Sequence, residues 1–202
     1  MRIETEAIVC GLTTHGEHGG VVRLLTPDIG LVAAYVRGAR GRRMRPVVIP
    51  GNLVSVQLRS RNDVQLPQAT LELTQSRAPV LAEPLPAAAI EWSTALIIAA
   101  LAERQPYPRV YEAMAGFLDA VEAAPSAHGW GEALARFELL LLNELGYGRT
   151  APGLGDSPAW PDLLRGLEVT GARLLRELPD NRRQPLRDSR ERLVSRLRKA
   201  SG

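Results

Sequence analysis

The stretch "VVRLLTPDIGLVAAYVRG", residues 21–38, places a turn between two segments rich in Val and Leu. Pro27 occupies the second position of a predicted type I turn, and Gly30 occupies the fourth. Residues 21–26 and 31–38 are therefore predicted to pair as a β-hairpin. This hairpin is the first indication that the N-terminal part of the chain is all-β.

Three further strands are predicted around the hairpin. Upstream, "IETEAIVCGL" (3–12) alternates between apolar and polar residues and is rich in Ile and Val. Downstream, the turn signal "IPGN" (49–52) precedes "LVSVQLRSR" (53–61), which places Val54, Val56 and Leu58 on one face. The last strand lies within "VQLPQATLELTQS" (64–76). Five strands with a longer excursion after the third are typical of a small closed barrel, and the OB-fold is the commonest five-stranded form.

The spacing of apolar residues changes near Ala78 from that of a strand to that of a helix, and every later segment is predicted to be helical. A proline-rich connector (77–86) precedes predicted helices at 87–103, 108–123, 130–145 and 160–178. A last helix is predicted near the end of the chain, where Asp188 and Glu191 have capping-box spacing. The helix "ALARFELLLLNELGYG" is apolar almost all round, which predicts burial in the middle of a bundle, with Gly146 as its C-cap. We predict an α+β protein with an N-terminal five-stranded OB-fold barrel (1–80) and an all-α helical domain (81–202), with a flexible loop near 149–158.

Composition narrows the functional classes. No apolar run reaches the roughly 18–20 residues of a membrane span, and the charged N-terminus is not a signal peptide, so we expect a cytoplasmic protein without membrane contact. Cys10 is the single cysteine, and "THGEHGG" (14–20) is expected to be a hairpin loop rather than a metal site. Nucleotide-binding and nucleophile motifs are absent. We therefore predict no catalytic residues, no metal and no cofactor.

Charge is divided unevenly along the chain. Residues 1–82 hold ten Arg and six acids, residues 83–150 hold four Arg and nine acids, and residues 151–202 hold eleven Lys or Arg and seven acids. The basic parts suit a polyanion, whereas the acidic middle does not. The three parts are thus expected to have different partners.

The segment "RGARGRRMRP" (37–46) carries five arginines and no acid between two predicted strands. One interpretation is a phosphate-binding loop, because each guanidinium can donate two parallel hydrogen bonds to phosphate oxygens. The alternative is a solvated loop that aids solubility. With Tyr35 as the only aromatic residue of this N-terminal part, nucleic-acid binding should be phosphate-dominated, sequence-blind and salt-sensitive. The candidate nucleic-acid-binding residues are Arg37, Arg40, Arg42, Arg43 and Arg45, extended by Arg23, Arg59 and Arg61, for which mere solvent exposure explains the pattern nearly as well.

The end of the chain carries a second basic run. Leu193, Val194 and Leu197 form a predicted buried stripe, and cations occupy the remaining positions. These cations are either a second nucleic-acid contact or favourably placed charges at a helix C-terminus. They are Arg190, Arg192, Arg196, Arg198 and Lys199.

Two stretches resemble the RecO family of bacterial recombination mediators. "EAIVCGLTTHGEHGGVVRLLTPDIGLVAAYVRGARGRR" (6–43) has a strand, a Gly-Glu turn, "LLTP…G" and a Gly-Ala-Arg basic loop, while "RFELLLLNELGYG" (136–148) is similar to a family helix that ends in Leu-Gly-Tyr or Leu-Gly-Phe. The resemblance covers residues 1–148 well and 160–198 loosely, and it implies an OB domain followed by a helical domain. Many members carry a cysteine-containing, zinc-finger-like segment after the second signature, but no Cys follows Cys10 here, so no metal is expected.

The resemblance implies a non-enzymatic DNA-binding recombination mediator in DNA repair, acting at the nucleoid. It implies binding of single- and double-stranded DNA, annealing of complementary strands coated with single-strand-binding protein, and assistance to RecA loading together with RecR. A generic OB-fold RNA-binding module and an interaction scaffold that acts through the acidic helical domain remain alternatives.

The resemblance also implies that the acidic C-terminal tail of single-strand-binding protein docks on the helical domain. Because residues 83–150 are acidic, docking requires an apolar groove with a cation beside it. The candidate partner-binding residues are Arg104, Arg109 and Arg136. Alternatively, these arginines pair with acids such as Glu103, Glu112 and Glu132.

Overall fold

The computed structural model describes residues 2–60, 65–124, 126–148 and 158–200. Five strands are followed by six helices, and the chain divides into two compact units. One unit comprises Met1–Pro79 and Leu101–Tyr111, and the other comprises Val80–Ala100 and Glu112–Gly202. The predicted fold class, an OB-fold barrel followed by a helical domain, is confirmed.

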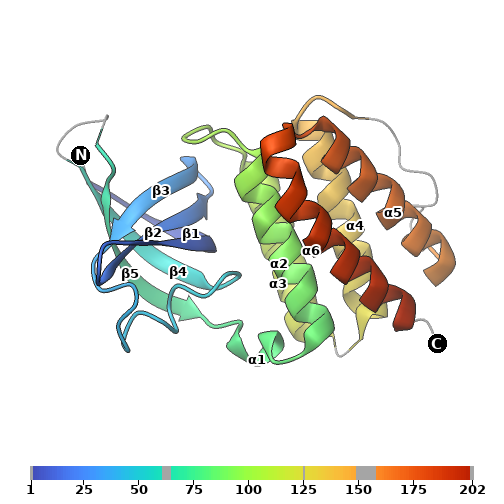
Figure 1. Ribbon diagram of the computed structural model, residues 1–202, viewed down its shortest axis with the longest axis horizontal. Coiled ribbons are helices and arrows are strands. Elements are labelled where there is room, and N and C mark those ends of the chain that lie inside the picture. The colour runs from blue at the N-terminus through green and yellow to red at the C-terminus, as the bar shows by residue number, and fades with distance from the viewer. Residues whose placement is uncertain (1, 61–64, 125, 149–157, 201–202) are drawn as a thin grey trace. The chain divides into compact units, whose positions relative to one another are not determined.

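The barrel is formed by β1 (Arg2–His15), β2 (Gly19–Thr26), β3 (Gly30–Val36), β4 (Leu53–Arg59) and β5 (Gln68–Gln75) (Figure 1). It closes in the order β1-β2-β3-β5-β4, and all pairs are antiparallel except β3 with β5. The first half of β1 pairs with β4 and the second half with β2, with a register shift between Val9 and Gly11. A single long strand thus joins both sides of the barrel. As the alternation in 53–61 predicts, Val54, Val56 and Leu58 are buried in the barrel core.

The predicted turn between β2 and β3 is held by Thr26, whose hydroxyl accepts a hydrogen bond from the Ile29 N–H and donates one to the Gly30 carbonyl. Gly30 has a φ of +76°, and a Cβ there would overlap the backbone of Gln105. The segment 101–111 therefore packs on this turn, although the sequence places it in the helical domain. The Arg104 N–H also donates to the Leu31 carbonyl at 2.9 Å, so this excursion is bonded to β3.

The helices are α1 (Ala78–Leu81), α2 (Pro84–Ala100), α3 (Pro108–Ala123), α4 (Ala127–Glu144), α5 (Trp160–Glu177) and α6 (Asp180–Lys199) (Figure 1). Helix α2 is buried on most of its surface, including Trp92. The prediction that α4 is buried all round is wrong: α4 buries one face, while Leu139 and Leu140 are half-buried and Arg136 is exposed. No helix within the described ranges is long and apolar enough to cross a membrane.

The end of α4 confirms the predicted C-cap. Gly146 has a φ of +83°, its N–H donates to the Asn143 carbonyl, and the Tyr147 N–H donates to the Leu142 carbonyl. These two bonds form a Schellman motif, which favours glycine at the left-handed position. The Leu-Gly-Tyr signature is therefore a helix terminator.

The last helix starts earlier than predicted. Helix α6 begins at Asp180, with Pro179 as its N-cap, so Asp188 lies inside the helix and the predicted capping box is wrong. Pro185 lies inside α6, so a proline at this position does not end the helix. Pro161 lies in the first turn of α5 as predicted. The predicted flexible loop, except for residue 158, lies outside the described residues.

Candidate nucleic-acid interface

The arginine loop, residues 37–46 between β3 and β4, is tied to the barrel by its apolar residues. Ala39 is fully buried in the barrel core and Met44 packs against that core. The Gly41 N–H donates to the Gly38 carbonyl at 2.8 Å, and the buried Asn52 amide donates to the Pro46 carbonyl at 2.8 Å. The loop is therefore attached to the barrel core through Ala39, Met44 and the Pro46 carbonyl.

The loop's charged side chains all point away from this core. Each of the five is exposed, and none forms an ion pair with an acid in the described part of the chain; they are Arg37, Arg40, Arg42, Arg43 and Arg45. Arg40 makes only a long hydrogen bond, 3.5 Å, to the Glu17 carbonyl of the β1–β2 turn. The fold thus presents uncompensated positive charge at this loop.

The three arginines expected to extend this surface have different environments. Arg23 forms an ion pair with Glu103 and is half-buried, so its charge is compensated within the unit. Arg59 is exposed at the end of β4 and lines a polar cavity with Gln65 and Gln68. Arg61 lies outside the described residues. Arg59 therefore keeps an exposed charge, whereas Arg23 does not.

Tyr35 on β3 is half-buried and packs edge-on against His15, with 6.1 Å between ring centroids. Gly19 leaves room for the Tyr35 ring, because a Cβ on Gly19 would overlap it. The ring is therefore part of the packing between β1, β2 and β3.

The three predicted partner-binding arginines are not among the residues that line the apolar cavity of the helical unit described below. Arg136 pairs with Glu132 one turn earlier on α4, with 2.6 Å between Nη2 and Oε1. Arg104 adopts a left-handed backbone, with a φ of +59°, and Arg109 is exposed in the first turn of α3. The pairing with Glu132 matches the alternative considered for Arg136.

An apolar cavity with cations beside it does occur in the helical unit. Its volume is about 510 Å³, and its walls include Pro84, Leu85, Pro86 and Trp130, with Arg196 and Lys199 at its edge. Arg196 is fixed there because its Nη1 donates to the Pro84 carbonyl at 2.6 Å. Sequence analysis missed this site because its walls come from the two helices α2 and α4, and its cations from α6.

The basic residues of α6 are mostly engaged by the fold. Arg190 pairs with Glu138 on α4, Arg192 with Glu91 on α2, and Arg198 with Glu168 on α5. These cations fasten α6 to three other helices. The interpretation of this run as a second nucleic-acid contact stays a prediction, because ion pairing within the fold does not test it.

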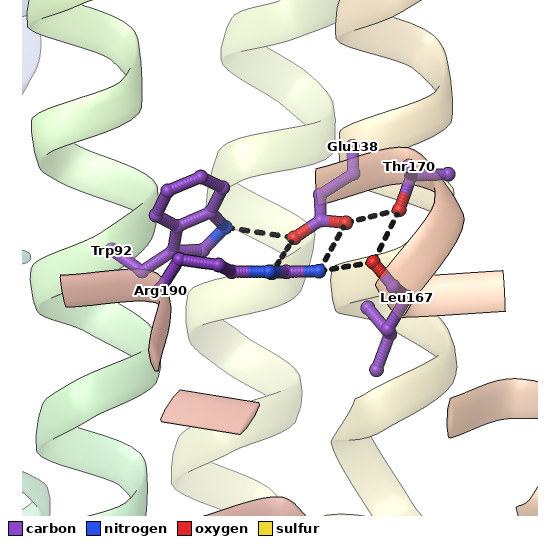
Figure 2. A network of polar contacts seen from close by, with 5 residues as sticks. All are labelled: Trp92, Glu138, Leu167, Thr170 and Arg190. Carbon is purple, nitrogen blue, oxygen red and sulfur yellow. Dashed lines mark hydrogen bonds and ion pairs between the residues drawn. The ribbon is translucent and has the colours of Figure 1, made fainter. Parts of the chain in front are cut away.

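Glu138 is the centre of a buried polar network (Figure 2). It accepts hydrogen bonds from Trp92 Nε1 at 2.7 Å and from the Thr170 hydroxyl, and it forms an ion pair with Arg190. The Arg190 guanidinium also donates to the Leu167 carbonyl and lies 4.7 Å from the Trp92 ring centroid. One carboxylate thereby connects α2, α4, α5 and α6.

A sequence signal for this network existed. Glu138 is four residues after Leu134 and four before Leu142, so it occupies a core position of α4. Arg190 lies between Leu186 and Leu193 in the same manner. A charged side chain at a core position requires a partner of opposite charge. Glu138 and Arg190 supply that partner to each other as a buried ion pair.

Groups that could support catalysis or metal binding are poorly placed. Burial raises the pKa of the Cys10 thiol to about 12, partly offset by a backbone hydrogen bond from Leu25, so Cys10 is a neutral thiol at physiological pH. Among the described residues, no cluster of three His, Cys, Asp or Glu side chains could hold a metal ion.

Comparison with known proteins agrees with this geometry. The family model described as "Recombination protein O N terminal" matches residues 1–77, which include the barrel and the arginine loop, and "Recombination protein O C terminal" matches residues 86–149. The chain belongs to the RecO family. RecO proteins are DNA repair proteins, and the two matches cover the two stretches on which the resemblance rests.

Curated RecO relatives align with most of the chain. The DNA repair protein RecO of Gluconacetobacter diazotrophicus is 32% identical over 96% of this chain and 94% of that protein. The DNA repair protein RecO of Sinorhizobium medicae is 34% identical over 88% of this chain and 70% of that protein. That of Rhodospirillum centenum is 38% identical over 71% of this chain and 56% of that protein.

Proposed function

We propose that this RecO-family protein binds single- and double-stranded DNA through its arginine loop and anneals complementary strands without catalysing a covalent reaction. It acts in the cytoplasm, at the nucleoid. The observation that carries the proposal is the arginine loop itself, with five exposed, uncompensated cations on a segment held by the barrel core.

The mechanism follows from the repulsion between two DNA backbones. Each strand carries a phosphate charge per nucleotide, and this repulsion opposes the approach of two strands. Arginines that contact phosphates neutralise part of the charge and release condensed counterions. Base pairing then selects the complementary strand, so the protein needs no contact with base edges.

The RNA-binding alternative receives less support from the barrel. Proteins that read RNA usually stack unpaired bases on exposed aromatic rings. In the described part of the barrel unit, the strands supply Tyr35, which packs against His15 and Gly19. The surface favours contact with phosphates, which DNA and RNA share, over contact with bases.

A strand-annealing assay tests the proposed function. Two complementary oligonucleotides, each coated with single-strand-binding protein, are expected to form duplex faster with the parent chain than without it. The same assay with RNA competitor measures the preference between nucleic acids. If the chain fails to accelerate annealing with and without single-strand-binding protein, the proposal is wrong.

The acidic tail of single-strand-binding protein is proposed to bind the cavity formed by Pro84, Leu85, Pro86 and Trp130. The apolar walls suit the apolar residue that ends the tail, and Arg196 and Lys199 suit its carboxylates. This cavity combines the apolar groove and the adjacent cation that tail docking requires. RecR is the proposed partner in RecA loading.

Lys199→Glu is expected to weaken binding of a tail peptide by about 5–10-fold. An exposed ion pair contributes roughly 1 kcal/mol or less, and the reversed charge adds repulsion of similar size. Fluorescence anisotropy of a labelled peptide measures the affinity. Arg136→Glu is the matched control and is expected to bind like the parent. Equal affinities for the parent and Lys199→Glu would place the tail elsewhere.

A further inference from the structure

Three arginines converge on a small cavity between α5 and α6. The cavity has a volume of about 280 Å³ and is lined by Ala172, Leu175, Arg176, Arg183 and Arg187. The aliphatic parts of the three arginines line the cavity together with Ala172 and Leu175. The arrangement is a cationic surface on the helical unit.

The fold fixes Arg183, pairs Arg176 with its neighbour in sequence, and leaves Arg187 without an ion pair to any described residue. Arg183 donates to the carbonyls of Arg176 at 3.0 Å and Leu178 at 2.7 Å, and pairs with Asp180 at 2.9 Å. It thus satisfies carbonyls at the C-terminus of α5. The Arg176 side chain is 71% exposed and contacts only the adjacent Glu177 carboxylate, at 3.1 Å. Arg187 is exposed and makes no ion pair or hydrogen bond with any described residue.

The arginines near the N-terminus of α6 and those near its C-terminus differ in how far acids compensate their charge. The carboxylates that face Arg190, Arg192 and Arg198 lie on other helices, so those charges are compensated within the fold. Residues 173–187, by contrast, hold five arginines against two acids, Glu177 and Asp180. Positive charge on this unit is therefore concentrated at the α5–α6 junction.

The chemistry of the surface favours phosphate over a peptide. A peptide is anchored by apolar side chains such as those of the cavity beside Trp130, whereas three of the five residues that line this smaller cavity are arginines. Adjacent guanidinium groups match phosphate oxygens, because each can donate two parallel hydrogen bonds. We propose that Arg176, Arg183 and Arg187 form a second phosphate-binding surface that contacts DNA separately from the arginine loop. This inference rests on the proposed function, in which two strands are held at once.

Removal of the charges of Arg176 and Arg187 tests the proposal. The variant R176Q/R187Q keeps Arg183 and its contacts at the end of α5. Affinity of the full chain for a single-stranded oligonucleotide is measured against salt concentration, with circular dichroism to verify the fold. The negative log–log slope is expected to become shallower by about 0.7 for each arginine that no longer binds a phosphate, or about 1.4 for the double variant.

The control variant R136Q/R165Q removes the same charge from two exposed arginines that lie outside the lining of this cavity and, like Arg176, pair with acids on their own helices. A slope for R176Q/R187Q that equals the control's slope overturns the inference. The variant R40Q/R42Q/R43Q tests the arginine loop independently, so failure of either surface is distinguishable from failure of the other. If R176Q/R187Q loses affinity for a polyglutamate peptide while its DNA slope stays unchanged, the surface docks acidic protein and the inference is wrong.

Discussion

Glu138→Ala is expected to lower the free energy of unfolding by about 3–5 kcal/mol, because it leaves the Arg190 guanidinium buried without a counter-charge. Trp92 and Thr170 lose their acceptor in the same variant (Figure 2). Since typical domains are stable by about 5–15 kcal/mol, this decrease is a large fraction of the total. Urea denaturation followed by circular dichroism measures the change.

Glu132→Ala is the matched control. It removes the same side chain from the same helix and also breaks an ion pair with an arginine, but Glu132 and Arg136 are both solvent-accessible. The expected cost is at most about 0.5 kcal/mol, as for exposed pairs spaced four residues apart. Similar midpoints for the two variants would contradict the buried network. The double variant Glu138→Leu/Arg190→Met should recover part of the stability, because it removes both charges together.

Replacement of Arg40, Arg42 and Arg43 by glutamine is expected to weaken DNA binding strongly and alike for every sequence. If each arginine contacts one phosphate, the negative log–log salt slope should become shallower by about 0.7–0.9 per arginine, or roughly 2–3 in total. Binding at low salt should fall most, because the attraction between arginine and phosphate is least screened there. Titrations of two unrelated oligonucleotides over a range of salt concentrations measure both effects.

The control for this variant removes Arg136, Arg165 and Arg198, which are exposed but paired with Glu132, Asp162 and Glu168 respectively. Net charge changes equally in the two triple variants. If both show the same slope, the effect belongs to net charge and not to the arginine loop. Weaker binding of one oligonucleotide only would indicate base readout, which is contrary to the proposal.

The strands and the barrel were predictable because their signals are local. Alternation in 53–61 and the Pro27–Gly30 turn determine which side chains face inward, and the structure agrees. The burial of α4 was not predictable from its leucines alone, since the number of neighbours around a helix depends on the rest of the bundle.

In the candidate site, too, the features with local sequence signals were predictable and those that depend on distant residues were not. Exposure of the arginine loop followed from its composition, whereas the environment of Arg23 depended on Glu103, which is 80 residues away in sequence. The core position of Arg190 indicated that it needs a partner, but which acids pair with Arg190, Arg192 and Arg198 was not predictable, because Glu138, Glu91 and Glu168 belong to three other helices. Pairing across such distances is a property of the tertiary structure.

The ion pair between α2 and α6 also bears on how this protein tolerates mutation. Glu91 is an exposed acid that would itself repel a phosphate, yet it occupies the guanidinium of Arg192. Replacement of Glu91 by a neutral residue would release that guanidinium and create a competing position for a polyanion. Such a change removes an exposed ion pair and should leave the fold nearly intact. Under the proposed function, Glu91 thus limits DNA binding at Arg192 by keeping that guanidinium paired.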